Sequence, residues 1–162
     1  MKTLVAIALL VLFPGVSALS QVDAQSGGKF SVAGIDDREV EQFFISFKGA
    51  VAKNDKKKVA SLIAFPTEVY LASSRRAIIK NEADFLSKYD QIFDGTFKQV
   101  ILRTEARDLW ANWSGVAMPR GEIWFSGIIE DVRRPEKYKI KITRINGPIR
   151  PDKSPKGKQG KI

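Results

Sequence analysis

The feature that most constrains the fold is the stretch 109–125, LWANWSGVAMPRGEIWF, which holds all three tryptophans of the chain around one turn signal. The fixed negative φ of Pro119 excludes it from the first position of the two-residue hairpin turns, which need a positive φ there. A turn centred on Pro119 and Arg120, with Gly121 left-handed, gives a three-residue loop instead. The sequence therefore predicts a β-hairpin here, and we expect it to be the nucleus of a sheet.

The predicted loop also sets the pairing of the two strands. Val116 would face Trp124, and the alternation of side chains then divides the hairpin into two faces. One face carries no polar side chain, so we expect it to face the core. Its residues are Leu109, Ala111, Trp113, Ala117, Ile123, Phe125 and Ile129.

The opposite face mixes large apolar side chains with small polar ones, a mixture typical of a pocket or a partner contact. In this interpretation the apolar groups anchor a ligand and the polar groups orient it by hydrogen bonds. A covering helix or a second subunit would fit the same pattern, so a homodimer stays an alternative to a small ligand or protein partner. The predicted face consists of Trp110, Asn112, Ser114, Val116, Met118, Trp124 and Ser126.

Residues 1–18 have the pattern of a secretory signal peptide. Lys2 supplies the charge, residues 4–13 are apolar, and Val16-Ser17-Ala18 is a small-x-small cleavage signal. The apolar run is too short to span a bilayer. We expect export to the periplasm or the medium, with cleavage after Ala18 or alternatively after Ala24, and a soluble mature protein.

The next residues, 19–35, are rich in Ser, Gln and Gly and are predicted to be a flexible leader. Residues 36–147 are predicted to be a single α+β domain. Asp36 or Asp37 caps its first helix. The apolar residues of this helix recur at helical spacing and form one stripe: Val40, Phe43, Phe44, Phe47 and Val51.

Further signals place the remaining elements of the domain. A second, short helix is expected from Lys56, and Pro66 is expected to end it before a strand at 67–71. After a second extended piece at 77–79, Asn81 caps a third helix that stops near Asp94-Gly95, and one or two further helical turns follow it. The last strand is predicted at 138–145, where apolar and basic residues alternate.

Residues 148–162 are predicted to be a disordered basic tail, because they are rich in Pro, Lys and Gly. Five basic residues against one acidic residue give the tail +4 of the formal net charge of +9. Weak, salt-sensitive contact of this tail with polyanions or anionic membrane surfaces is therefore an alternative function. No nucleic-acid motif is present, and we expect no specific nucleic acid as a partner.

The chain contains neither Cys nor His. This excludes a thiol nucleophile, a Ser-His-Asp triad and zinc sites built from thiolates or imidazoles. We expect no metal site and no cofactor. Acid–base chemistry would fall to carboxylates and phenols, and since their spacing shows no convergence, a protein without catalysis is favoured. The candidates for such chemistry are Tyr70, Tyr89, Asp90, Asp108 and Glu122.

Three runs of residues, VASLIAFPTEV, IIKNEADFLSKYDQIF and DLWANWSGVAMPRGEIWFS, carry a resemblance that covers roughly residues 36 to 145. They resemble small exported bacterial proteins of unknown function with a cystatin-like cone, related in fold to nuclear transport factor 2. The resemblance implies N-terminal helices packed on a curved antiparallel β-sheet, and it implies no activity. Some members of the wider superfamily are isomerases and dehydratases that use Asp, Tyr or His in the cone.

Two functions from different classes follow. The first is a non-catalytic binding module that uses a sheet face or the cone pocket. The second is a cofactor-free isomerase or hydro-lyase that uses Asp and Tyr groups inside the cone.

Overall fold

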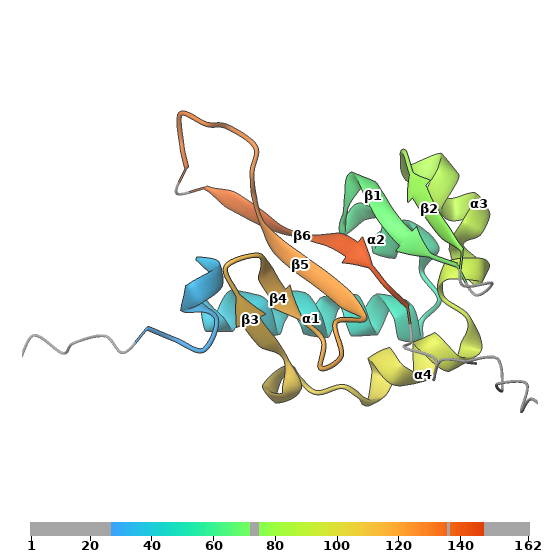
Figure 1. The fold of residues 1–162 in the computed structure, drawn as a ribbon, viewed down its shortest axis with the longest axis horizontal. Coiled ribbons are helices and arrows are strands. Elements are labelled where there is room, and N and C mark those ends of the chain that lie inside the picture. The colour runs from blue at the N-terminus through green and yellow to red at the C-terminus, as the bar shows by residue number, and fades with distance from the viewer. Residues whose placement is uncertain (1–26, 72–74, 136, 148–162) are drawn as a thin grey trace, which may run out of the picture.

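In the part of the chain that the structure describes, helices and strands are segregated into two layers, four α-helices and a six-stranded sheet (Figure 1). The computed structural model describes residues 27–71, 75–135 and 137–147. The elements of these ranges, in chain order, are η1 (Ser31–Ala33), α1 (Asp37–Ala52), α2 (Lys56–Ser61), β1 (Ile63–Tyr70), β2 (Arg76–Ile79), α3 (Glu82–Ile92), α4 (Gly95–Arg103), η2 (Ala106–Asp108), β3 (Trp110–Asn112), β4 (Gly115–Ala117), β5 (Ile123–Ile129) and β6 (Tyr138–Ile145). The predicted signal peptide and basic tail lie outside the described residues.

Helix α1 forms where the sequence predicts it. The Asp36 carboxylate accepts hydrogen bonds from the backbone N–H groups of Arg38 at 2.9 Å and Glu39 at 3.2 Å, which caps the helix. The helix buries one stripe of side chains against the sheet, and this stripe is Val40, Phe44, Phe47, Ala50 and Val51.

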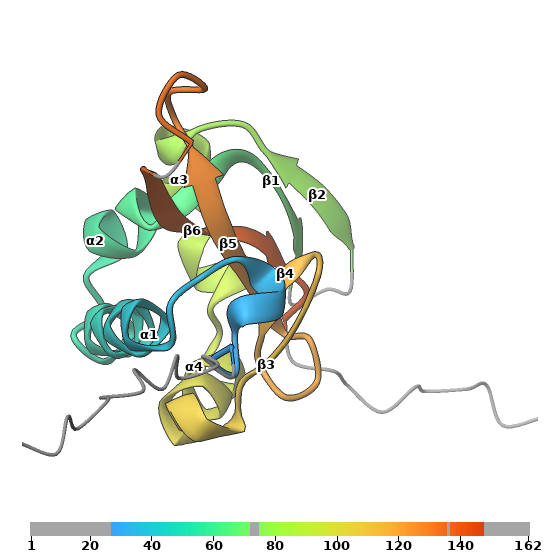
Figure 2. The ribbon, with the colours of Figure 1, turned by 90° about the vertical axis from the view of Figure 1, so that its left-hand side faces the viewer.

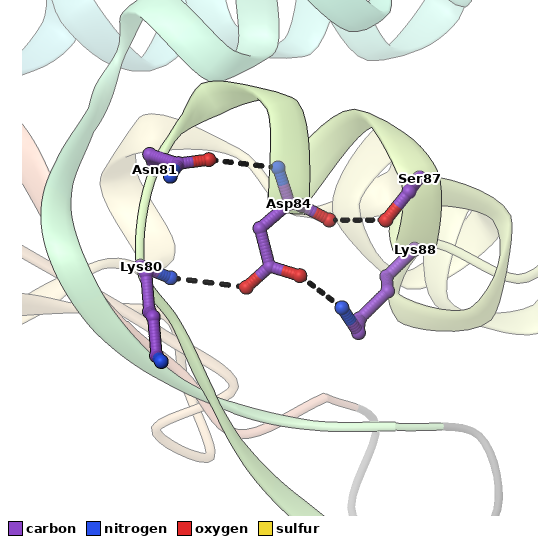
Figure 3. Close-up of polar contacts among 5 residues, drawn as sticks. All are labelled: Lys80, Asn81, Asp84, Ser87 and Lys88. Atoms are coloured by element: carbon purple, nitrogen blue, oxygen red, sulfur yellow. Dashed lines mark hydrogen bonds and ion pairs between the residues drawn. The ribbon is translucent and has the colours of Figure 1, made fainter.

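Helix α3 also begins at its predicted cap (Figure 3). The Asn81 side-chain oxygen accepts from the Asp84 N–H at 2.9 Å, but Asp84 accepts from the N–H of Lys80 at 3.1 Å rather than from Asn81. The capping box is therefore shifted by one residue. The Lys88 ammonium donates to Asp84, and this bond, with that from Lys80, lowers the pKa of the carboxyl.

The sheet is mixed, with the strand order β2-β1-β6-β5-β4-β3. β1 runs parallel to β6, while every other neighbouring pair is antiparallel. The predicted purely antiparallel sheet is therefore wrong at this pair, and the sheet is not closed into a cone. Pro66, expected to precede the strand, lies inside β1, in the stretch between Ile63 and Glu68 where the pairing with β6 is irregular.

The predicted strand across residues 109–118 is two strands, β3 and β4, joined by a tight turn. The Asn112 side chain shapes this turn by accepting from the Ser114 N–H at 2.8 Å. Trp113 lies at the tip with 87% of its side-chain surface exposed, so its predicted place in the core is wrong. The Asx turn outweighed the β-propensity of the tryptophan.

The turn between β4 and β5 has the expected left-handed Gly121, with φ 75°, but its loop is one residue longer than predicted. Glu122 joins the loop: its carboxylate accepts from the Arg120 N–H at 2.9 Å and its carbonyl accepts from the Asn146 N–H at 2.8 Å. Val116 therefore pairs with Phe125 instead of Trp124. A shift by one residue turns a strand over.

This shift explains why the residues of β4 lie on the opposite faces to those predicted. Val116 and Met118, predicted on the mixed face, are fully buried in the core, while Ala117 takes the opposite face. Ile129, predicted in the core, is 48% exposed near the end of β5. The other core assignments of the hairpin agree with the structure.

An aromatic cluster fills the space between the helices and the sheet. Tyr89, Phe93 and Phe97 are stacked at one-helical-turn intervals, with ring centroids 5.1 and 5.4 Å apart. Phe30 and Ile35 also belong to the core, so the packed domain begins before residue 36.

The four α-helices lie on one side of the sheet, and none of the described helices covers the other side at its centre (Figure 2). Core residues such as Phe125 and Ile142 point toward the helices. Their neighbours along the strands point to the helix-free side.

Candidate functional site

One row of paired residues crosses the helix-free side of the sheet. Trp110 pairs with Ala117, Ala117 with Trp124, and Trp124 with Arg144. The indole rings of Trp110 and Trp124 meet edge to face, with centroids 5.1 Å apart and planes at 81°. Ala117 lies between them and is fully buried, because the two rings cover it.

Both indoles are held in place by the hairpin. The Nε1–H of Trp110 donates to the Met118 carbonyl at 3.0 Å. A Cβ atom at Gly121 would approach Trp124 Nε1 to 3.2 Å, so the glycine leaves room for that ring. Trp110 is nevertheless 37% exposed, and Trp124 is partly exposed. Two fixed aromatic surfaces are thus offered to solvent.

The predicted polar groups of this face are used mainly within the protein. Ser126 Oγ donates to the Ser114 carbonyl at 3.0 Å, and the Asn112 side-chain oxygen is engaged in the β3–β4 turn. Of these three, only Ser126 lies on β5 beside the indoles, since Asn112 and Ser114 belong to the exposed end of the hairpin. The seven predicted residues are therefore not brought together as one site.

A cation that the sequence analysis missed completes the row. Arg144 is exposed and makes no ion pair or hydrogen bond with any described residue, while Glu68 beside it pairs with Arg76 at 2.5 Å. Strict alternation along β6 would put Arg144 on the same side as the buried Ile142. Its pairing slips between Trp124 and Phe125, which turns Arg144 to the helix-free side.

We call the surface formed by Trp110, Trp124, Ser126 and Arg144 the tryptophan face. It combines two flat apolar rings with a guanidinium group and a hydroxyl. Such a surface can hold a flat or apolar group by ring contact and an anion by the guanidinium.

Of the five candidate acid–base groups, Tyr89 and Asp90 are neighbours on α3, and the other three lie elsewhere in the fold. Asp90 on α3 forms an ion pair with Lys56 at 2.7 Å, and Asp108 accepts from the Glu105 N–H at 2.9 Å in the cap of η2. Glu122 is buried in the hairpin loop, and Tyr70 lies at the end of β1. No hydrogen bond between described residues joins any two of the five. The structure thus brings no acid–base pair together.

Tyr89 is the most perturbed of these groups. Its hydroxyl is buried without a hydrogen-bond partner among the described residues, and its ring lies under the ammonium groups of Lys56 and Lys98, at 5.2 and 5.1 Å. Burial, with the nearby charges of Asp90 and Asp55, raises the pKa of the phenol to about 12. A phenol with such a pKa is a poor general base at neutral pH.

A groove that sequence analysis did not predict lies between α1 and β6. It has a volume of about 420 Å³. The Tyr138 hydroxyl donates to the Glu39 carboxylate at its wall, which raises the pKa of the phenol. The residues around the groove are Glu39, Gln42, Phe43, Ser46, Leu62, Tyr138, Lys139, Ile140 and Lys141.

Comparison of the chain with protein-family models, curated proteins and solved structures found no match. The family resemblance of the three sequence runs therefore stays an expectation. Within residues 27–71, 75–135 and 137–147, no group of His, Cys, Asp and Glu side chains is placed to hold a metal ion. The helices of those ranges are too short or too polar to cross a membrane.

Proposed function

We propose that the protein is an exported, non-catalytic binding domain that uses the tryptophan face to hold a ligand with a flat apolar group and an anionic group. The observation that carries this proposal is Arg144, an exposed cation whose guanidinium has no partner among the described residues and which pairs in the sheet with Trp124, whose ring meets that of Trp110. An unpaired guanidinium beside aromatic rings is a common arrangement for binding carboxylates, sulfates and phosphates.

The enzyme alternative finds less support. It needs two acid–base groups in one cavity, whereas no hydrogen bond between described residues joins any two of the candidates, and the aromatic cluster fills the layer between helices and sheet. Binding to anionic surfaces through the basic tail remains a separate alternative, since the tail lies outside the described residues.

A flat aromatic sulfonate, 8-anilinonaphthalene-1-sulfonate, is a suitable probe because it combines both proposed ligand features. Its fluorescence should rise on binding to the folded protein, and Arg144→Gln should weaken that binding by about tenfold, the value of one charge-assisted hydrogen bond. Trp124→Ala should weaken it as well. Added salt should reduce the affinity of the native protein and not that of Arg144→Gln.

Arg38→Gln is the matched control, because Arg38 is an exposed arginine of α1 on the helix side of the sheet. Trp124→Ala uncovers Ala117 and can destabilise the sheet, so thermal unfolding is measured for every variant. Equal probe affinity in native protein and folded Arg144→Gln would contradict the proposal. If sedimentation shows that the native protein is a dimer and Trp124→Ala is a monomer, the tryptophan face binds a second copy of the protein and not a ligand.

Export is proposed from the pattern of residues 1–18. Expression of the full chain in a bacterial host, followed by mass spectrometry of the periplasmic fraction, should give a mature protein beginning at Leu19. A cytoplasmic protein that retains Met1-Lys2 would contradict it.

A further inference from the structure

The first half of β6 has a strand neighbour on one side only. β5 pairs with β6 from Tyr138 to Ile142 without interruption. β1 begins its pairing with β6 only at Ile142. The first four residues of β6 therefore form an open edge within the sheet, extending beyond the end of β1 (Figure 1).

The backbone of this edge has its hydrogen-bonding groups free. The Ile142 N–H donates to the Leu62 carbonyl at 2.8 Å, so it points away from β5. Because these directions alternate along a strand, the N–H and C=O groups of Tyr138 and Ile140 point the same way. Neither N–H is bonded to another described residue on that side. An unpaired edge is a template for an added strand.

The open edge borders the groove between α1 and β6. Phe43 from α1, Leu62 before β1 and Ile140 from β6 supply its apolar surface. A volume of about 420 Å³ accommodates the side chains of a short extended segment. The groove therefore adds side-chain contacts to the main-chain bonds that the edge offers, which is how sheet edges bind peptides.

The side chains of β6 define the chemistry of such a segment. Tyr138 and Ile140 pack toward the helices, whereas Lys139 and Lys141 alternate to the helix-free side. Lys139 has a solvent-exposed ion pair with Glu130, and the Lys141 ammonium donates one hydrogen bond to the Ser61 carbonyl at 2.6 Å, which leaves its charge unneutralised. A neighbouring strand would place one set of side chains against Phe43 and Ile140, and the other set beside the two lysines.

We propose that this open edge binds an extended segment of a partner protein in which apolar and acidic residues alternate. The segment would lie beside β6, in line with β1, as an added strand. This inference goes beyond the proposed function, because the edge lies at the groove and does not use the two indoles.

The test uses the mature protein labelled with ¹⁵N and the capped peptide acetyl-Asp-Val-Asp-Val-Asp-amide. Peptide addition should slow amide hydrogen exchange at Tyr138 and Ile140 by roughly tenfold or more, because both amides gain an acceptor. The Lys139 and Lys141 amides, which already pair with β5, should change less. A peptide with lysine in place of aspartate should bind at least several-fold more weakly.

Ser46→Trp should abolish the effect by filling the groove, since Ser46 is an exposed residue of its wall. Ile45→Trp is the matched control: Ile45 is 60% exposed on the same helix and does not line the groove. Thermal unfolding verifies that both variants fold.

Four results would overturn the proposal. The first is unchanged exchange at Tyr138 and Ile140 with millimolar peptide. The second is full protection of both amides without peptide, which would mean that the protein itself covers the edge. The third is equal loss of binding in Ser46→Trp and Ile45→Trp. The fourth is self-association that protects the same amides, because it would identify a second copy of the protein, and not a partner segment, as the occupant of the edge.

Discussion

Phe125 joins the sheet to helix α1 through ring contacts. Its ring lies 5.1 Å from that of Phe43 and 6.4 Å from that of Phe44, and it is 1% exposed. Phe125→Ala should lower the free energy of unfolding by about 3–5 kcal/mol through lost burial and the cavity left behind. Urea denaturation of the native protein and the variant measures this difference in the free energy of unfolding. Trp113→Ala, at the 87% exposed hairpin tip, should change it by less than about 0.5 kcal/mol.

The buried hydroxyl of Tyr89 makes a second residue-scale prediction. The raised pKa, about 12 against the ordinary 10.0, means that the unfolded chain ionises first as the pH rises. This contribution to stability is complete below pH 10 and is lost as the pH rises through 12. The decrease in the free energy of unfolding between pH 10 and pH 12 should therefore be smaller in Tyr89→Phe than in the native protein, by about 2 kcal/mol.

At neutral pH, Tyr89→Phe should be neutral or slightly stabilising, because it removes a polar group that has no partner among the described residues. Chemical denaturation at pH 7, pH 10 and pH 12 gives both values. A variant that is strongly destabilised at pH 7 would show that the hydroxyl is hydrogen-bonded in solution.

At the scale of elements, two glycines in different backbone environments give opposite predictions. Gly115 begins β4 with φ 134°, and a Cβ there would lie 2.6 Å from the Phe125 carbonyl oxygen. Gly115→Ala should therefore destabilise the protein by about 1–3 kcal/mol. Gly49 lies inside α1 with nothing within 4 Å of a Cβ. Gly49→Ala should stabilise it by about 0.5–1 kcal/mol. Thermal unfolding of the two variants compares them directly, and a shift in the same direction would contradict the assignment.

The elements differ in how far their sequence determined them. Local signals sufficed for α1, α3 and β6, where a cap or a strict alternation coincides with the observed boundary. The hairpin faces were predicted incorrectly because the loop has one residue more than predicted, namely Glu122. Glu122 belongs to the loop because it accepts hydrogen bonds from the backbone N–H groups of Arg120 and Asn146. Asn146 is distant in sequence, so no local pattern contained that information.

The candidate site was likewise predictable from the sequence only in part. Trp110 and Trp124 were placed on the correct face from the hairpin alone. Arg144 was not, because a slip in pairing between two strands turns it over. The groove between α1 and β6 arises from tertiary packing and has no signature in the sequence.

At the scale of the whole molecule, charge is unevenly distributed along the chain. The formal net charge is +9, and residues 148–162 contribute +4 of it. Removal of these residues after Gly147 should weaken binding to vesicles containing anionic lipid at low salt, and the difference should vanish at high salt. Co-sedimentation with vesicles measures both. Equal vesicle binding by the full and the truncated protein at low salt would show that the tail does not contribute to binding anionic surfaces.

The last strand of the chain is also an inner strand of the sheet, between β1 and β5. Until β6 has been synthesised, β2-β1 and β5-β4-β3 have no strand to join them, and their apolar faces have no common core. β1 and β6 are separated by most of the domain's sequence, so their pairing forms slowly compared with local contacts. A ribosome-bound chain lacking residues 138–145 should therefore remain open to chaperones and proteases. Residues 138–145 are therefore needed before the two parts of the sheet can join.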